Sequence, residues 1–346
     1  MTHNILDKYT INRKMPVNYI EGELDFCKKE FSYQTYDVKL LELKNCVVNK
    51  RGFVYEQSKL MLNKLSLLDE KRYTDLLNVK HYVKKVLVRK KRSVGNAKYL
   101  LVHDDWTSNH YHWFCDLLPR IFAVRNIVKD HILLLPDSDY VRKIGLQSLE
   151  FFGLEPAGIE FIKDDELVKV KNLSLVTHTA LTGYINDMII QDMRSFLNTK
   201  INYDKLPKNN IYVTRDRASY RKVLNEIEIW DVVRSRGYEV VRFEDLSWKD
   251  QVIQSASANS LVTLHGAGLV NTIFMPHNGS VLEFRRDKIY HNQCFWHLAG
   301  ALNLNYYYLF GTPDNDELVL EGGDSCNLTI NPIKLDSILQ SMIEKK

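Results

Sequence analysis

From about Lys80 onward, the hydrophobic residues of this 346-residue chain alternate between short β-branched runs and longer segments with helical periodicity. This alternation is typical of βαβ units, in which helices cross the sheet to join parallel strands. The chain is also roughly twice as long as a single domain of about 150 residues. We therefore predict an α/β protein with two domains.

Three strands and two helices are predicted in the first half. The strands are expected at residues 83–88, 99–102 and 132–135, where the apolar runs are short. Residues 109–128 and 140–152 have helical periodicity, and Gly153 marks the end of the second helix. The first 75 residues mix aromatic and lysine-rich stretches, and we interpret them as an additional β or helical decoration.

A second series follows the polar stretch 202–210, which we interpret as an interdomain linker. We expect strands at residues 211–213, 239–243, 261–264 and 281–284, and helices at residues 225–236, 248–257, 269–275 and 292–302. The prediction is an N-terminal domain over residues 1–203 and a C-terminal domain over residues 204–346, whose last helix could cross back to the first domain.

The composition excludes several classes of protein. With 45% hydrophobic and 26% charged residues, the chain resembles globular proteins rather than disordered ones. No apolar stretch approaches the ~20 residues of a membrane-spanning helix. The net charge of +4 is mild, so we expect no nucleic-acid partner. No N-terminal signal is visible, and the mature chain is expected to begin where the sequence does.

The five cysteines are scattered and odd in number, which argues against both a disulfide framework and a structural zinc site. We therefore predict a cytoplasmic protein. The basic residues Lys84, Lys85 and 89–92 could contact anionic lipid, which would place the protein at the inner face of the membrane, although a solvated loop is the simpler interpretation.

The most informative segment covers residues 260–276. A buried strand leads into His265, Gly266, Ala267 and Gly268, and a short helix follows. Backbone N–H groups and the positive end of the helix converge at such a turn, and glycine lets a phosphate approach the backbone closely. We predict a phosphate site in which His265 donates to a phosphate oxygen. A turn that serves only tight strand-to-helix packing is the alternative.

Three further residues of this region belong to the predicted donor site. Leu269 opens the helix, and Asn271 stands where the dinucleotide fingerprint has its third glycine. Glu283 ends the next strand, where it is expected to accept hydrogen bonds from ribose hydroxyls.

A basic cluster follows the first strand of the second half. Arg215 stands at the end of that strand, and Arg221, Asn225 and Glu226 precede the next helix. A guanidinium at a strand end, opposite a glycine turn, matches the geometry of phosphate. We predict that these residues bind a diphosphate. A solvated run of surface charge is the alternative.

A candidate for the chemistry lies in the first half. On a helix, His112, Asp116 and Arg120 share one face. Either His112 or Asp116 is suited to remove a proton from an acceptor hydroxyl. Pro119 interrupts the helix, so we expect either a kink or a new helix capped by Asp116. A partly buried histidine with a purely structural role is the alternative.

Together these segments resemble the glycosyltransferase 61 family, formerly a domain of unknown function, which includes plant xylosyltransferases and animal O-linked N-acetylglucosaminyltransferases. The resemblance lies in His112, Trp113, Asp116, Pro119 and Arg120, in residues 212–226, and most specifically in residues 265–283. It covers residues 106–283, about half of the chain.

The resemblance implies a GT-B fold, with two Rossmann-like α/β/α domains facing a central cleft. It implies that the C-terminal domain holds a nucleotide-sugar donor, with UDP-sugar favoured, and that the other domain meets a saccharide or glycolipid acceptor. The reaction would invert the anomeric carbon without a metal or other cofactor. Synthesis of a surface polysaccharide such as a capsule is the expected setting.

Other functions use the same residues differently. Asp137 and Asp139 form an Asp-x-Asp pair after a strand, as in metal-dependent GT-A glycosyltransferases, and a similar pair recurs at Asp314 and Asp316. An oxidoreductase would use the same glycines, but its fingerprint would open the first βαβ unit. A nucleotide-binding module without catalysis also remains open.

Overall fold

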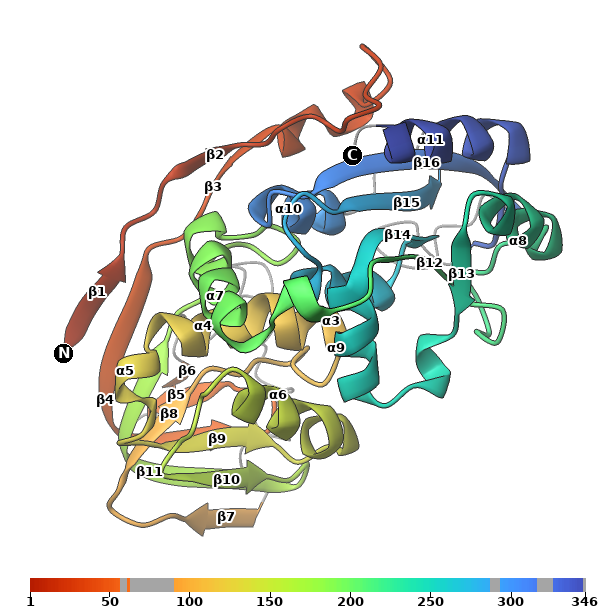
Figure 1. Ribbon diagram of the computed structural model, residues 1–346. Coiled ribbons are helices and arrows are strands. Elements are labelled where there is room, and N and C mark those ends of the chain that lie inside the picture. Colours follow the sequence, from red (N-terminus) through yellow and green to blue (C-terminus); the bar gives the residue numbers. More distant parts are fainter. Residues whose placement is uncertain (57–60, 63–89, 287–292, 316–325, 345–346) are drawn as a thin grey trace. The chain divides into compact units, whose positions relative to one another are not determined.

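The computed structural model describes residues 1–56, 61–62, 90–286, 293–315 and 326–344 (Figure 1). Its strands and helices confirm the predicted α/β class. The chain forms two compact units. Unit 1 consists of Met1–Thr10 and Gln34–Ile189, and unit 2 consists of Ile11–Tyr33 and Ile190–Lys346. The boundary predicted between residues 203 and 204 lies further along the chain than this division.

Unit 1 is built on a mixed sheet with the strand order β10-β9-β8-β11-β4-β5-β6, in which β1 also pairs with β4 and β7 with β11. Residues 1–10 and 34–56 contribute strands to this sheet. The strands are β1 (Thr2–Leu6), β4 (Val38–Asn49), β5 (Val54–Glu56), β6 (Met61–Leu62), β7 (Lys90–Ser93), β8 (Lys98–Leu101), β9 (Ile132–Pro136), β10 (Gly158–Ile162) and β11 (Glu166–Val176).

The parallel part of this sheet sets the position of one candidate site. Strands β9, β8 and β11 are parallel, and Leu101 pairs with both Leu134 and Leu175. The residues that follow β8 and β11 therefore emerge side by side at one edge of the sheet. The predicted strands at residues 99–102 and 132–135 are confirmed. The strand predicted at residues 83–88 lies outside the described residues.

The helices of unit 1 confirm the predicted helical stretches 109–128 and 140–152. Gly153 adopts φ +64°, as expected of a residue that ends a helix. The helices are α3 (His110–His112), the π-helical η3 (Trp113–Leu117), α4 (Leu118–Ala123), α5 (Arg125–Val128), the π-helical η4 (Val141–Gly145) and α6 (Leu146–Phe151); α7 (Asp187–Lys200) begins in unit 1 and continues in unit 2.

Unit 2 contains a sheet with the strand order β13-β12-β14-β15-β16-β17, and all its pairs are parallel except β16 with β17. The four predicted strands of the second half are confirmed. The strands are β12 (Asn209–Val213), β13 (Tyr238–Val241), β14 (Ala258–Leu264), β15 (Ser280–Arg286), β16 (Asn305–Pro313) and β17 (Leu328–Thr329), and a separate pair is formed by β2 (Thr10–Asn12) and β3 (Ser32–Gln34).

The four predicted helices of the second half are also confirmed, although the third is a 3₁₀ helix. The helices of unit 2 are η1 (Asp25–Glu30), η5 (Tyr203–Lys205), α8 (Glu226–Ser235), η6 (Phe243–Asp245), α9 (Trp248–Ser257), the 3₁₀ helix η7 (Ala267–Phe274), α10 (Cys294–Ala301) and α11 (Pro332–Glu344). Within the described residues, no helix is long and apolar enough to cross a membrane.

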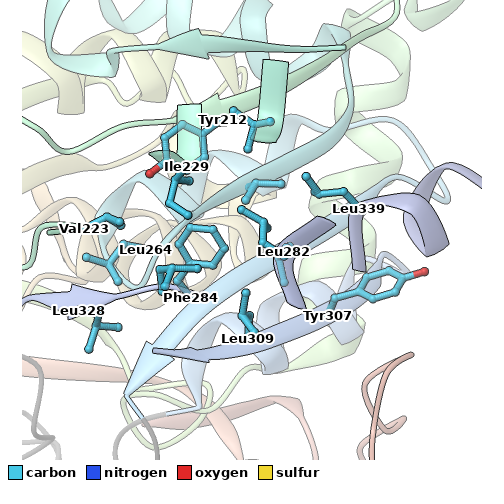
Figure 2. Close-up of a cluster of buried hydrophobic side chains, with 14 of the residues drawn as sticks. Tyr212, Val223, Ile229, Leu264, Leu282, Phe284, Tyr307, Leu309, Leu328 and Leu339 are labelled. Carbon is cyan, nitrogen blue, oxygen red and sulfur yellow. The ribbon is translucent and has the colours of Figure 1, made fainter. Parts of the chain in front are cut away.

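One face of the unit 2 sheet is covered by α8 and α11. Figure 2 shows Ile229 of α8 and Leu339 of α11 packed with Leu282 and Phe284 of β15 in a buried cluster. Side chains alternate along a strand, so Glu283 points to the opposite face. That face carries α10, because Phe295 of α10 contacts His265, the hydrogen-bond partner of Glu283.

The connections that leave β12 and β14 therefore diverge. Strand β12 leads to α8 on one face, whereas β14 leads to η7, which packs against α9 and α10 on the other face. The order of the strands thus reverses between β12 and β14. In open parallel sheets, ligands bind in the crevice outside the carboxyl ends of the strands at such a point.

Two glycines in the left-handed region provide a matched test of the unit 1 packing. Gly52 has φ +75°, and a Cβ there would lie 2.2 Å from the backbone oxygen of His103, whereas Gly237 has φ +76° with open space around it. We expect Gly237→Ala to lower the free energy of unfolding by about 1 kcal/mol through backbone strain alone. Gly52→Ala should cost about 3 kcal/mol, because the loop after β8 must also move.

Hydrogen exchange in urea measures the loss in the free energy of unfolding. The amides of β4 and β8 report on Gly52→Ala, and those of β12 and β14 report on Gly237→Ala. Equal losses for the two variants would contradict the close contact between Gly52 and the loop that carries His103.

Candidate functional site

The predicted phosphate turn follows β14. The chain keeps the direction of β14 as far as His265, because the backbone N–H of His265 still donates to the carbonyl of Phe284 in β15 (3.0 Å). Gly266 immediately precedes η7, and its carbonyl accepts from the N–H of Leu269 (3.0 Å). Gly266 is buried, whereas Ala267 and Gly268 are partly exposed. The backbone at Ala267 and Gly268 is therefore the part of the turn that a ligand can reach.

Arg215 lies directly over this turn. It follows β12, and a Cβ on Gly266 would stand 2.9 Å from its Nη1. The Nε of Arg215 donates to the carbonyl of Arg221 (3.1 Å). Burial, followed by the charge of Arg221, lowers the pKa of Arg215. Within the described part of the chain no ion pair neutralises this guanidinium, so a bound anion would stabilise it.

Gly268 is not required by packing within the protein. A Cβ there would meet only Phe243 and Val213, at 3.7 and 3.8 Å, which are ordinary contact distances. The alternative of a turn that serves only tight packing therefore finds no support at Gly268. A ligand that approaches the backbone closely would still require glycine at this position.

Three other predicted donor-site residues hold the loop that carries Arg215. Arg221 adopts φ +58° and presents its carbonyl to Arg215. Asn225 exchanges two hydrogen bonds with the backbone of Ile330 (2.8 and 3.0 Å). Glu226 accepts from the hydroxyls of Tyr212 (2.8 Å) and Thr214 (2.5 Å), while its Oε2 is buried without a hydrogen-bond partner among the described residues.

Two of the four predicted residues of η7 lie in the interior. Leu269 is fully buried, and the Nδ2 of Asn271 donates to Gln251 of α9 (3.2 Å). Asn271 thus ties η7 to α9, and its side chain is 1% exposed. Neither side chain lies at the exposed surface of the turn.

His265 is oriented by a buried network on β15 and β16. Its Nδ1 hydrogen bonds to Oε1 of Glu283, and the hydroxyl of Tyr306 donates to Oε2. The guanidinium of Arg285 donates to the Tyr306 hydroxyl (3.1 Å). Burial alone would raise the pKa of Glu283, but the charges of Arg285 and His265 hold it below its ordinary value.

The role predicted for Glu283 requires a carboxylate oxygen that is open to ribose. Both oxygens instead accept hydrogen bonds within the protein, and the side chain is 2% exposed. The carboxylate fixes the imidazole of His265 at the end of β14. Sequence reasoning missed Tyr306 and Arg285, since neither belongs to a recognisable motif.

The structure brings the two candidate bases of unit 1 together. The Nδ1 of His112 hydrogen bonds to Oδ2 of Asp116 (2.7 Å), and the hydroxyl of Thr182 donates to the same oxygen (2.7 Å). Asp116 is buried, while the side chain of His112 is 16% exposed.

The expectation that Asp116 caps a new helix is wrong. The chain passes through the π-helical η3 into α4, where Pro119 occupies the first turn and needs no N–H partner.

A second buried cluster lies beside this pair and was not predicted. The Nε2 of His178, just after β11, hydrogen bonds to Asp104, just after β8 (3.0 Å). Arg120 donates to the carbonyl of Val176 and lies 3.3 Å from the same His178 nitrogen. Burial would raise the pKa of Asp104, but His178 and Arg120 hold it well below its ordinary value. Burial lowers the pKa of Arg120 to about 10.

Two residues of the metal-dependent alternative are engaged elsewhere. Asp137 accepts from the Nε of Arg142 (2.7 Å), and Asp314 accepts from the side chain of Asn327 (2.6 Å). Asp316 lies outside the described residues. In the ranges that the structure describes, no three His, Cys, Asp or Glu side chains are grouped to hold a metal ion.

The basic residues considered for lipid contact are only partly within the described chain. Residues 84, 85 and 89 lie outside it, whereas Lys90, Lys91 and Arg92 form β7. Arg92 pairs with Glu160 (2.6 Å) and Glu166 (3.3 Å). All five cysteines are buried, and none of them forms a disulfide.

Comparison with known proteins identifies the same segments. The family model described as glycosyltransferase 61 matches residues 110–282, half of the chain. The chain is also 26% identical over 217 residues to the EGF domain-specific O-linked N-acetylglucosamine transferase of Drosophila melanogaster. The match covers 55% of this chain and 41% of that relative.

The buried network around Glu283 predicts a pH-dependent contribution to the stability of unit 2. Glu283→Gln leaves Arg285 without a carboxylate, and we expect a loss of about 3 kcal/mol in the free energy of unfolding at neutral pH. The pKa of Glu283 is lowered in the folded protein. Its contribution to the free energy of unfolding is therefore complete above the ordinary pKa of 4.5 and is lost as the pH falls through the folded pKa.

Urea unfolding of both proteins between pH 7 and pH 3, followed by hydrogen exchange in β14 and β15, measures this difference. The exposed Glu239 of β13 gives a control, since Glu239→Gln should change stability little at either pH. A difference for Glu283→Gln that stays constant down to pH 3 would contradict the assigned charge.

Proposed function

The chain belongs to the glycosyltransferase 61 family, and from this premise we propose that it transfers a sugar from a nucleotide diphosphate donor, UDP-sugar by preference, to a saccharide hydroxyl. Membership of the family makes the chain a glycosyl-transferring enzyme with a sugar donor and a glycan acceptor. The donor, the inverting stereochemistry and the residues are our proposal. The Drosophila relative, which the chain matches over less than half of its length, is named as an O-linked N-acetylglucosamine transferase, and by analogy this name supports transfer of a sugar to a hydroxyl.

One observation carries the donor site. The guanidinium of Arg215 lies over Gly266 at the carboxyl ends of β12 and β14, where the connections of the sheet diverge. The diphosphate binds between this guanidinium and the backbone amides of Ala267 and Gly268. The positive end of η7 and the fork of Arg215 both favour an anion there.

His265 stabilises the leaving group. In the transfer, an acceptor oxygen attacks the anomeric carbon, the bond from that carbon to the phosphate oxygen breaks, and its electron pair stays on the nucleotide diphosphate. A positioned donor is most effective where this charge develops. Glu283 accepts from Nδ1 and so favours the imidazolium form of His265, whose Nε2–H donates to the diphosphate. No metal is required for this step.

His112 is the base that takes the acceptor proton. Asp116 accepts the hydrogen bond of Nδ1, so the lone pair lies on Nε2, and the imidazole is the more exposed member of the pair. A buried carboxylate that orients a histidine through Nδ1 is the arrangement used in hydrolytic triads. Asp116 is then a positioning residue, which also stabilises the imidazolium after proton transfer.

We further propose the GT-B arrangement that the family resemblance implies, with two domains facing a central cleft and an in-line, inverting displacement. A cytoplasmic enzyme, or one at the inner face of the membrane, that builds a surface polysaccharide from a saccharide or glycolipid acceptor is the proposed setting. A metal-dependent enzyme that uses Asp137 and Asp139 is the second candidate, and activity in excess EDTA would exclude it.

Thermal stabilisation by UDP, GDP and CMP, each with and without EDTA, tests the donor class. A nucleotide that binds the folded protein at 100 times its dissociation constant adds about 2.7 kcal/mol. We expect UDP to stabilise the protein equally with and without EDTA. Stabilisation by none of the nucleotides would overturn the proposal.

Two arginines of the same loop test the diphosphate contact. Arg215→Ala should weaken UDP binding at least about tenfold, because it removes charge-assisted hydrogen bonds. Arg217 is 61% exposed at its side chain and pairs with Asp245, so Arg217→Ala should stay within about twofold of wild type. Calorimetric titration with UDP measures both. Equal affinities for the two variants would remove Arg215 from the site.

Two histidines of one helical segment test the base. His112→Gln should lower the rate of UDP release from the preferred UDP-sugar at least about a hundredfold, with UDP affinity unchanged. His110, whose Nδ1 hydrogen bonds to Tyr140 (2.9 Å), gives the control, since His110→Gln should stay within about threefold. Asp116→Asn should resemble His112→Gln, because it disturbs the tautomer. Full turnover by His112→Gln would assign the base elsewhere.

A further inference from the structure

Trp106 is a large aromatic side chain at the surface of unit 1. It follows β8 and is 50% exposed, although tryptophan is highly buried on average. Its position at the carboxyl end of β8 places it on the edge of the sheet where Asp104 and His178 meet. In parallel sheets this edge is where ligands bind.

The backbone around Trp106 is held in a fixed conformation. Its N–H donates to Oδ1 of Asp104 (2.9 Å), and its carbonyl accepts from the N–H of Asn109 (2.9 Å). The N–H of Asp104 in turn donates to the hydroxyl of Thr107 (2.9 Å). Asp104 itself is buried and bonded to His178. The indole is therefore presented by a rigid turn, and little conformational entropy is lost when a ligand binds it.

Trp106 is also stacked on the candidate base. Its ring lies 5.6 Å from that of His112 with an interplanar angle of 28°. The Nδ1 of His112 is fixed by Asp116, so the imidazole and the indole share one orientation. The imidazole covers part of one indole face, and a ligand on the uncovered part of that same face would lie beside His112.

We propose that Trp106 is the platform on which the ring of the acceptor saccharide stacks, so that one of its hydroxyls meets Nε2 of His112. A pyranose ring has a face of C–H groups that is apolar and matches the negative face of an aromatic ring. Stacking removes this face and the indole from water together. This inference rests on the proposed function, since it names the substrate class of the same site.

Stacking also fixes the height of the sugar ring above the site, which hydrogen bonds alone do not do. Proton transfer to a base requires the hydroxyl to lie within about 3 Å of the nitrogen, and a flat platform fixes the height of the sugar ring above the site. A peptide hydroxyl has no comparable face and gains little from the indole. The acceptor is therefore a saccharide in the pyranose form.

The test measures binding of methyl β-D-glucopyranoside and methyl β-D-galactopyranoside by saturation-transfer NMR, with the protein saturated with UDP. Wild type should bind at least one of them, with saturation strongest at the C–H protons of one ring face, and should not bind sorbitol, which has hydroxyls but no ring. Trp106→Ala should weaken the affinity about tenfold, and Trp106→Phe should retain most of it.

Ile5 of β1 gives a surface control. It is 39% exposed on a strand that does not neighbour β8, and Ile5→Ala should leave binding unchanged. UDP affinity measured on every variant reports that the protein is folded. Trp106→Ala with wild-type affinity, or a wild type that binds UDP but neither pyranoside, would overturn the inference alone. A wild type that fails to bind UDP would instead count against the proposed function.

Discussion

The organisation of unit 2 depends on the divergence of the chain after two neighbouring strands. Strand β12 feeds α8 on one face and β14 feeds η7 on the other, so their carboxyl ends open between the two connections. Arg215 and Gly266 leave these strand ends and meet there. A partly buried guanidinium then faces main-chain amides, and the combination is stabilised by an anion. The donor site that we propose, and the role that we propose for His265 in it, are based on this geometry.

In unit 1, residues that follow neighbouring parallel strands also meet at one edge of the sheet, but there they form a buried charged cluster. Strands β8 and β11 are parallel neighbours, and the residues after them supply Asp104 and His178. Their charges are buried with Arg120, which makes the edge of the sheet rigid and polar. The partly exposed His112 and Trp106 are supported by this edge. The base and the platform that we propose are fixed in orientation, which would reduce the entropy that the acceptor must lose in the reaction.

Local sequence patterns predicted the strands and helices around both sites because hydrophobic periodicity and glycine stops are local signals. They also indicated that Arg215 and Gly266 belong together, since both follow strands. The partners of Glu283 and the pair of Asp104 with His178 could not be predicted in this way, because they depend on strand order and register. The π-helical turn before Pro119 was missed for another reason. It arises where one extra residue enters the helix, and no residue type specifies it.

A structure of the protein with UDP bound would test the central claim most directly. We predict that the diphosphate oxygens lie within hydrogen-bond distance of the guanidinium of Arg215 and of the backbone amides at Ala267 and Gly268, with Nε2 of His265 directed at the terminal phosphate. UDP bound away from the carboxyl ends of β12 and β14 would contradict the donor site and every role that we derive from it.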